Sequence, residues 1–332
     1  MSKSLPRVAA MACFIVLLGL LTACNSDGPN SRTLYSGSRG VDLSFPEQNS
    51  FQQFANDTFS IAVRLQNDGA FSINDSNRSA YLNVIFDPSV FELQYAQSFL
   101  EKTGGILGPA SASIPFLVDG RALDNPIGGV EYADFTFRAR TLPSNRALLE
   151  SPITFQACYP YKTTFLKNVC VDRDYYTQKN TPVCISRTVT DTSQGAPVAV
   201  TSVEPRFTRV GQSSVKPRFV VTITNLQDGY TVWTNESASA QELCTFEDFN
   251  KAGYGRIEVG ARLGATELEC GVGSNVTRFE ANQARIICGV PEGDPALNTI
   301  FQTGANYEAL LSIELHYFYI TSQTARIQVE RP

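Results

Sequence analysis

Cysteine is the residue type in this chain that offers the most chemistry. The 332 residues include eight cysteines but a single histidine. In an exported protein, an even number of cysteines usually forms disulfide bonds. There is no C-x-x-C pair and the spacings are wide, which disfavours a zinc site, and we expect no metal or other cofactor. We expect all six cysteines downstream of the N-terminal segment to be disulfide-bonded: Cys158, Cys170, Cys184, Cys244, Cys270 and Cys288.

The pairing of these six depends on where the chain turns. Residues 163–168 are interpreted as a hairpin tip, which places Cys158 and Cys170 opposite each other on paired strands. Two further cysteines end short strands around the polar stretch 271–282. The last pair follows by elimination. The predicted bridges are Cys158–Cys170, Cys270–Cys288 and Cys184–Cys244.

The other two cysteines belong to the N-terminus. Lys3 and Arg7 precede the almost wholly apolar stretch 8–21. That stretch has the length of a signal-peptide core and is shorter than the ~20 residues that a spanning helix needs. It ends in Leu21-Thr22-Ala23-Cys24, an aliphatic residue and two small ones before cysteine, which matches the bacterial lipobox. Residues 1–23 are therefore predicted to be a signal peptide.

The lipobox implies a defined anchor. Bacterial lipoproteins are cleaved before the lipobox cysteine, whose thiol and new amine are then acylated, and several acyl chains give stable anchoring. We therefore expect acylated Cys24 to hold the mature protein to the lipid bilayer, outside the cytoplasm in the cell envelope. Asn25 follows Cys24, which resembles the signal for the outer membrane if the host has two membranes.

Other reactive residue types are sparse. His316 alternates with Leu315 and Tyr317, so we expect it on the solvent face of a strand, beside Glu314. Without a second histidine, a Ser-His-Asp triad or a histidine zinc site has little support. A pair of carboxylates distant in sequence remains an open route to glycosidase chemistry.

Two residue groups are weighed for binding. The acidic residues Asp75, Asp172 and Asp174 lack the twelve-residue loop with a closing glutamate that calcium sites of the EF-hand type use, so we expect solvated loops. The tyrosine-rich segments are more readily explained by cross-strand packing than by a sugar- or protein-binding surface. They are Tyr159–Tyr161, Tyr175–Tyr176 and Tyr317–Tyr319.

The elements that position these residues are strands. Residues 59–66 alternate between apolar and other side chains and stop at Asn67-Asp68-Gly69, which is typical of a half-buried strand followed by a turn. The same period recurs at 153–159, 219–223, 257–263 and 313–319. Crossover helices for a parallel sheet are lacking. The fold class predicted is all-β, with immunoglobulin-like β-sandwiches.

Composition and spacing indicate the domain organisation. With 43% hydrophobic residues, 18% charged residues and a net charge of −5, the chain is globular and lacks the basic footprint of a nucleic-acid-binding protein. Residues 61–67 and 219–225 share one pattern 158 positions apart, which indicates a duplication. The boundary is placed at 188–197, a polar run ending in Gly and Pro. The predicted parts are a tether at 24–40, a first sandwich at 41–190 and a second at 195–332.

Several of these segments carry a resemblance. Alternating strands that end in Asn-x-Gly near the start of each repeat, together with Cys158-Tyr159-Pro160-Tyr161, residues 169–172 and residues 194–200, resemble CARDB-type and archaeal S-layer-associated immunoglobulin-like domains. The resemblance implies a β-sandwich and a cell-surface or adhesion setting. It carries over no active-site residue.

Three functions compete. The leading hypothesis is a non-enzymatic, lipid-anchored envelope protein that displays sandwich modules for adhesion, ligand binding or envelope assembly, with a protein or glycan partner. The second is an envelope hydrolase or lyase that acts on a polysaccharide or peptide through acidic residues. The third is a scaffold subunit of a secretion or filament assembly. A pocket with two carboxylates of perturbed pKa would favour the enzyme, and an exposed patch or open edge strand would favour binding.

Overall fold

The prediction of an all-β sandwich fold is confirmed. The computed structural model describes residues 35–46, 50–74, 80–98, 106–173, 183–211, 214–233, 244, 253–295, 301–302 and 304–332. Strands make up 63% of the described residues and helix 1%. No helix in these ranges is long and apolar enough to cross a membrane. Residues 1–34, which include the predicted signal peptide and Cys24, lie outside them.

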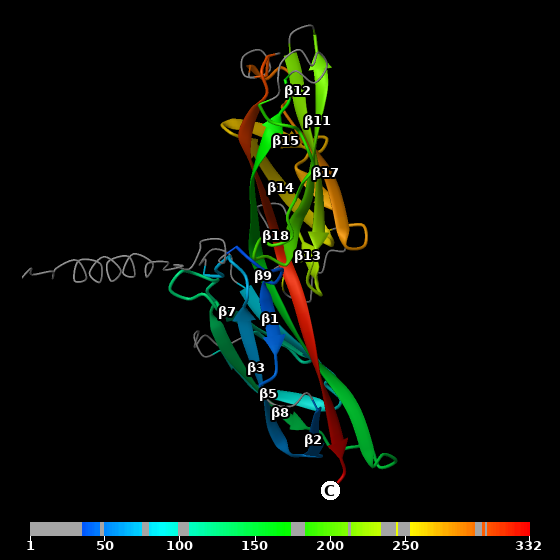
Figure 1. Ribbon diagram of the computed structural model, residues 1–332. Coiled ribbons are helices and arrows are strands. Elements are labelled where there is room, and N and C mark those ends of the chain that lie inside the picture. The colour runs from blue at the N-terminus through cyan, green and yellow to red at the C-terminus, as the bar shows by residue number, and fades with distance from the viewer. Residues whose placement is uncertain are drawn as a thin grey trace, which may run out of the picture.

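Two strands run the length of the molecule (Figure 1). Strands β9 (Leu148–Val171) and β18 (Tyr307–Glu330) are equally long and pair antiparallel at every position. Each has 24 residues. At a rise of about 3.4 Å per residue, this ribbon is ~80 Å long. Ordinary strands have roughly 3–10 residues. The ribbon therefore acts as a spine shared by a lower body and an upper body.

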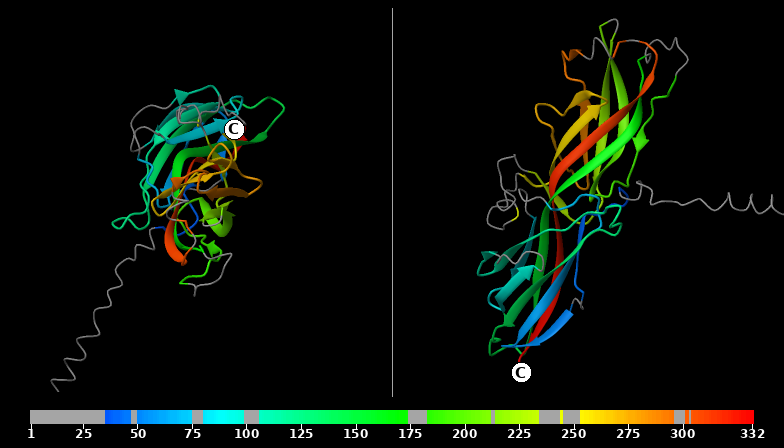
Figure 2. Two further views of the ribbon diagram at one scale, coloured as in Figure 1. Left: turned by 90° about the horizontal axis from the view of Figure 1, so that it is seen from above. Right: turned by 90° about the vertical axis from the view of Figure 1, so that its left-hand side faces the viewer.

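The lower body is a sandwich around the lower halves of the two long strands (Figures 1 and 2). One sheet has the order β1-β3-β8-β5. Its strands are β1 (Val41–Ser44), β3 (Thr58–Asn67), β8 (Val130–Ala139) and β5 (Phe91–Ser98). The facing sheet adds to the ribbon β4 (Ala80–Phe86), β7 (Ser111–Phe116), β6 (Ile106–Leu107) and β2 (Ser50–Phe54). Aromatic side chains fill the space between them, with the ring centroids of Phe135 and Phe155 5.1 Å apart.

The upper body repeats this plan around the other halves of the ribbon. One side consists of β11 (Val198–Val210), β12 (Ser214–Asn225), β17 (Gln283–Gly289) and β15 (Thr266–Cys270), in that order, with β10 (Val189–Thr190) beside β11. The other side adds β14 (Arg256–Leu263), β13 (Tyr230–Val232) and β16 (Val276–Arg278). Strand β15 pairs with both β14 and β17 and so joins the two sides.

The pairing register shows that the two bodies are copies of one unit. Strand β4 pairs with β9 at residues 153–158, and β14 pairs with β18 at 311–316, which is the same offset of 158 positions as in the sequence. Likewise, Val41 lies opposite Asn67 at the start of β1, and Val198 lies opposite Asn225 at the start of β11. Each repeat contributes its long strand to both bodies.

Independent folding of residues 41–190 and 195–332 remains a prediction, but strand pairing crosses that division. Arg326–Glu330 at the end of β18 pair in parallel with Ser50–Phe54 of β2, in the lower body. The upper half of β9 pairs with the upper half of β18, on the opposite side of the division. The two bodies therefore differ from the two sequence segments.

Four tyrosines fill the waist between the bodies. Tyr159 lies opposite Tyr319 and Tyr161 lies opposite Tyr317 on the paired long strands. Their ring centroids are 5.9 Å and 6.0 Å apart, and all four side chains are buried, so the packing interpretation of these two segments is confirmed. Tyr175 and Tyr176 lie outside the described residues.

Loops from both repeats satisfy the tyrosine hydroxyls. Tyr161 Oη donates to the carbonyl of Gly195 at 2.7 Å, and Val41 N donates to Tyr159 Oη at 3.0 Å. Gly69 ends the turn predicted after β3, and a Cβ atom there would overlap Tyr161 Oη, so only glycine fits. Burial raises the pKa of all four hydroxyls above the ordinary value near 10.

Candidate functional site

All six predicted cysteines form disulfides, but only one predicted pairing is right. The bonds are Cys158–Cys244, Cys170–Cys184 and Cys270–Cys288, with Cα–Cα distances of 5.5, 5.7 and 4.0 Å. The Cys270–Cys288 prediction is confirmed. The predictions of Cys158–Cys170 and Cys184–Cys244 are wrong.

The error has a physical cause. Residues 163–168 are no hairpin tip, because strand β9 runs through them without a break and pairs with β18 throughout. A strand that runs from residue 158 to residue 170 places Cys158 and Cys170 about 40 Å apart. The Cα atoms of a disulfide are usually about 4.4–6.8 Å apart and never ~40 Å, so each cysteine bonds to a different segment that passes beside it.

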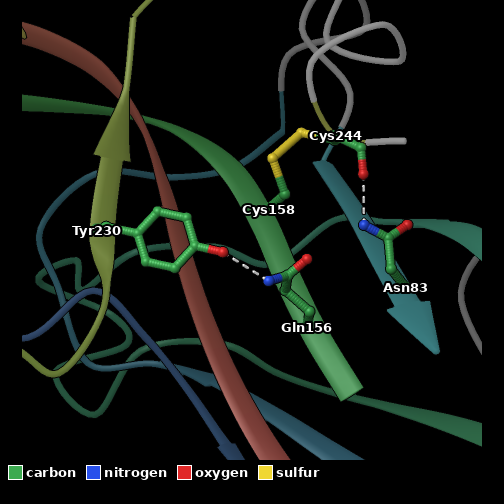
Figure 3. The surroundings of a disulfide bond; sticks show 5 residues. All are labelled: Asn83, Gln156, Cys158, Tyr230 and Cys244. Atoms are coloured by element: carbon green, nitrogen blue, oxygen red, sulfur yellow. Dashed lines mark hydrogen bonds between the residues drawn. A yellow bond between two sulfur atoms is a disulfide. The ribbon is translucent and has the colours of Figure 1, made fainter. Parts of the chain in front are cut away.

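The Cys158–Cys244 bond closes a polar layer next to the ribbon (Figure 3). Asn83 donates a hydrogen bond to the carbonyl of Cys244, and Gln156 donates to Tyr230 Oη at 2.8 Å. The carbonyl oxygens of the Asn83 and Gln156 side chains are buried and have no hydrogen-bond partner among the described residues. The bond ties a segment of the second repeat to a strand of the first.

The two aspartates whose pKa is raised do not form a catalytic pair. Burial raises the pKa of Asp42 and of Asp134. Asp42 lies opposite Gln66 and Asp134 lies opposite Ala62. Those two β3 positions are ~13 Å apart along the strand. Paired glycosidase carboxylates lie roughly 5–9.5 Å apart. These two acids therefore lack the spacing of such a pair.

The remaining predicted chemistry is structural where it is described. His316 Nε2 lies 3.5 Å from Glu314 Oε2 on the outer face of β18, as expected. Lys162 Nζ lies 2.7 Å from a carboxylate oxygen of Glu314 and, by hydrogen bonding, lowers the pKa of that carboxyl. Within the described ranges there is no group of three or more metal-ligating side chains. Asp75 and Asp174 lie outside those ranges.

A basic groove lies on the outer face of the upper body. Its cavity of about 710 Å³ runs over β12 and β17, whose inward-facing residues Phe219, Val221 and Ile286 belong to the core. Four cationic side chains and one carboxylate line it, with aliphatic side chains between them. We define the basic groove by Arg206, Lys216, Arg218, Val220, Glu269, Val272, Arg285, Ile287 and Gly289.

Strand register sets the spacing inside the basic groove. Directly opposite residues share a face, so Arg218 and Gly289 form one row, Val220 and Ile287 the next, and Thr222 and Arg285 the third. Successive rows are about 6.6 Å apart. The groove therefore has an arginine at each end and an aliphatic centre.

Two of the four cations in the basic groove have an ion-pair partner and two have none among the described residues. Arg206 is held by Glu204, 3.1 Å away, and buried Lys216 has exposed Glu292 at 3.7 Å. Arg218 and Arg285 form no ion pair with any residue of the described chain. Both arginines are exposed and available to an anionic group.

The Cys270–Cys288 bond fixes one wall of the basic groove. Cys270 lies directly opposite Cys288 on β15 and β17, and both side chains are buried beneath the groove. The next residue but one along the chain is Val272, whose side chain is fully exposed at the rim. The disulfide thus holds the rim at a fixed distance from Ile287.

The alternation of residues along β12 and β17 is a sequence signal for this site. Lys216 and Arg218 alternate with the core residues of β12, and Arg285 alternates with those of β17. Such alternation indicates cations on an outer face. It does not show which strands are neighbours, so the groove cannot be predicted without the pairing register of β12 and β17.

Comparisons with known proteins give no family for the chain and distant structural matches. No family model matches the chain, and no curated protein matches it. Among solved structures, a type I cohesin–dockerin complex from Clostridium thermocellum matches 37% of this chain and 84% of its own, with 16% identity and a TM-score of 0.27. The C-terminal domain of the Streptococcus pyogenes antigen I/II-family protein AspA matches 89% of this chain and all of its own, with 6% identity and a TM-score of 0.21.

Proposed function

We propose that this protein is a non-enzymatic binding protein of the cell envelope that holds an anionic partner in the basic groove. The observation that carries the proposal is the pair Arg218 and Arg285, which flank an aliphatic centre on a rigid sheet face and have no ion pair in the described chain. A cation without a partner at the rim of a concave surface attracts anionic groups and fixes their register.

The equivalent face of the lower body supports a specific role for the groove. There, the rows of β3 and β8 place Thr136 opposite Ser60 and Asp134 opposite Ala62. By the offset of 158 positions, Ser60 and Ala62 correspond to Arg218 and Val220. At these two positions the upper body thus carries a cation and an aliphatic side chain where the lower body carries Ser60 and Ala62, and the arginines of the lower face, Arg64 and Arg138, lie in other rows. The fold therefore does not require an arginine at the position of Arg218.

The proposal includes a lipid anchor on Cys24, which attaches the molecule near its waist. Gly37 N donates to Ser193 Oγ and Gly40 N donates to Gln227 Oε1, both at 2.8 Å, so the chain enters between the bodies. The short span from Cys24 to Tyr35 reaches at most ~40 Å, and the anchor would hold both bodies close to the membrane. Three disulfides are typical of an extracytoplasmic protein.

Polyanion binding by the full-length protein in detergent tests this function. Fluorescence anisotropy with labelled poly-L-glutamate and labelled polygalacturonate measures affinity at low and high salt. We expect at least one probe to bind and its affinity to weaken with salt. Combined Arg218→Glu and Arg285→Glu substitutions should reduce that affinity by at least about tenfold, the equivalent of two exposed ion pairs.

The lower body offers the matched control. Arg64 and Arg138 lie on the outer face of β3 and β8, so Arg64→Glu with Arg138→Glu makes the same change of charge away from the groove. Binding of neither probe by the wild type would refute the function, as would an equal loss in the control variant.

A further inference from the structure

We propose that the basic groove recognises an extended peptide segment in which two acidic side chains, four residues apart, flank an aliphatic side chain midway between them. This inference rests on the function proposed above and adds the class and pattern of the ligand.

The spacing of the rows leads to the pattern. Arg218 and Thr222 lie two rows apart on β12, and Arg285 lies opposite Thr222. The two arginines therefore start from rows ~13 Å apart. In an extended peptide, residues i, i+2 and i+4 point to one side, and the first and last are also ~13 Å apart. A peptide along the strands can thus place an acid at each arginine row and one side chain at the row between them.

The middle row specifies an aliphatic side chain. Val220 and Ile287 lie opposite each other there, and Ile287 is 52% exposed although it is a large apolar residue. Val220 itself is buried, at 8% exposure, so the exposed aliphatic surface comes from Ile287 and from Val272 at the rim. A ligand side chain that covers this row removes apolar area from water, which a second charged group would not do.

The lining favours a peptide over a polysaccharide. Among the described residues, no aromatic side chain lines the basic groove, so a sugar ring would lack the flat apolar surface on which it usually stacks. Gly289 lies beside Arg218 in the first row, where a Cβ atom would approach Arg218 Cγ to 3.2 Å. The missing side chain leaves room for the methylene chain of Arg218 to lie across Gly289.

Two carboxylates near the basic groove affect which acidic peptides it prefers. Glu269 lies on the far side of Gly289 from Arg218, in the same row, and Glu204 is engaged by Arg206. Glu204 lies opposite Val220, in the middle row, so its carboxylate disfavours an acid placed in that row, because like charges repel. A dense run of acids should therefore gain less than two acids at the right spacing.

Three capped peptides test the pattern by anisotropy or calorimetry. The designed probe is Gly-Ser-Glu-Ser-Leu-Ser-Glu-Ser-Gly. The first control, Gly-Ser-Glu-Glu-Leu-Ser-Ser-Ser-Gly, has the same composition but places the two acids on opposite sides of an extended chain. The second control replaces the leucine of the designed probe by serine. Each is titrated into the full-length protein and into the Arg218→Glu, Arg285→Glu and Ile287→Ser variants, whose changed side chains are exposed.

We expect the designed probe to bind at least about fivefold tighter than either control, the equivalent of one exposed ion pair or one partly buried methyl group. Either arginine variant should abolish the preference over the composition control. Ile287→Ser should remove only the preference over the serine control.

Other outcomes overturn the inference in distinguishable ways. Equal affinities for the designed probe and the composition control would refute the spacing. Groove-dependent binding of polygalacturonate with no binding of the peptides would assign an anionic polysaccharide and refute the peptide class, while the proposed function would stand. Failure of every probe, including poly-L-glutamate, would refute both.

Discussion

Removal of single disulfides should destabilise the protein by unequal amounts that follow the corrected connectivity. Cys158 and Cys244 are 86 positions apart in sequence, whereas Cys170 and Cys184 are 14 apart. On the chain-entropy model, the longer loop is worth about 4.6 kcal/mol and the shorter loop about 3.0 kcal/mol. The double variant Cys158→Ala/Cys244→Ala should therefore lose ~1.5 kcal/mol more than Cys170→Ala/Cys184→Ala.

The structure adds to the effect of the longer bond. Both Cys158 and Cys244 are fully buried, and Asn83 and Gln156 beside them already have unpartnered oxygens. Release of residue 244 would also deprive the Asn83 amide of its acceptor, which is costly for a buried donor.

Equilibrium urea denaturation, followed by circular dichroism, measures both losses. The Cys270→Ala/Cys288→Ala variant is the reference for a short loop, since these two cysteines are 18 positions apart. Its loss should be about 3.2 kcal/mol. Equal losses for the longest and the shortest loop, or a larger loss for the shortest, would refute the reasoning. Non-reducing peptide mapping of the wild type checks the connectivity itself.

Three further predictions concern the waist and the anchor. Tyr159→Phe should cost about 1–3 kcal/mol, because buried Val41 N loses its acceptor. The exposed-face control Tyr132→Phe should change urea stability by less than about 0.5 kcal/mol, and equal effects of the two substitutions would contradict the waist assignment. Because the pKa values of the waist tyrosines are raised in the folded state, they contribute stability that is present below pH ~10 and is lost as the pH rises through the raised values. In an alkaline titration, the tyrosinate absorbance of these residues should therefore appear late and together with unfolding. Early ionisation of all tyrosines would argue against a buried waist. Cys24→Ala should abolish incorporation of labelled fatty acid and release the protein from the membrane fraction, and an unlipidated wild type would refute the anchor.

The alternation of apolar residues predicted the strands and the fold class well. Residues 59–66 lie within β3, 219–223 within β12 and 257–263 within β14. The pattern shared by residues 61–67 and 219–225, 158 positions apart, also corresponds to a structural repeat. These features are local or periodic, so a single sequence contains them.

The spine was not predicted because its length is unusual. Strand β9 is far longer than the ordinary range of roughly 3–10 residues, and that range favours a turn within the segment, at 163–168. The residue types in this segment favour a continuous strand over a turn, since Thr163, Thr164 and Phe165 are common in strands and no Gly or Pro interrupts them. Pro160 is accommodated because the pairing of β9 with β4 ends at Cys158, which leaves β9 with one paired neighbour at that position.

The basic groove depends on the pairing of strands that are distant in sequence, which a local sequence pattern does not contain. Arg218 and Arg285 lie far apart in sequence and meet only because β12 pairs with β17. Two of the disulfide predictions are wrong for the same reason, since a cysteine bonds to a segment that lies beside it in space. Long-range register is the missing information in both cases.

A methyl-resolved NMR titration tests the central claim, that the outer face of β12 and β17 is the binding surface. Poly-L-glutamate is added to the full-length protein in detergent, with assigned methyl signals of Val220, Ile287 and Val130. Val130 lies on the corresponding face of the lower body and is exposed to solvent. Saturable shifts of Val220 and Ile287 at concentrations that leave Val130 unchanged are the predicted result. Shifts of Val130 alone, or shifts of all three that do not saturate, would contradict the claim.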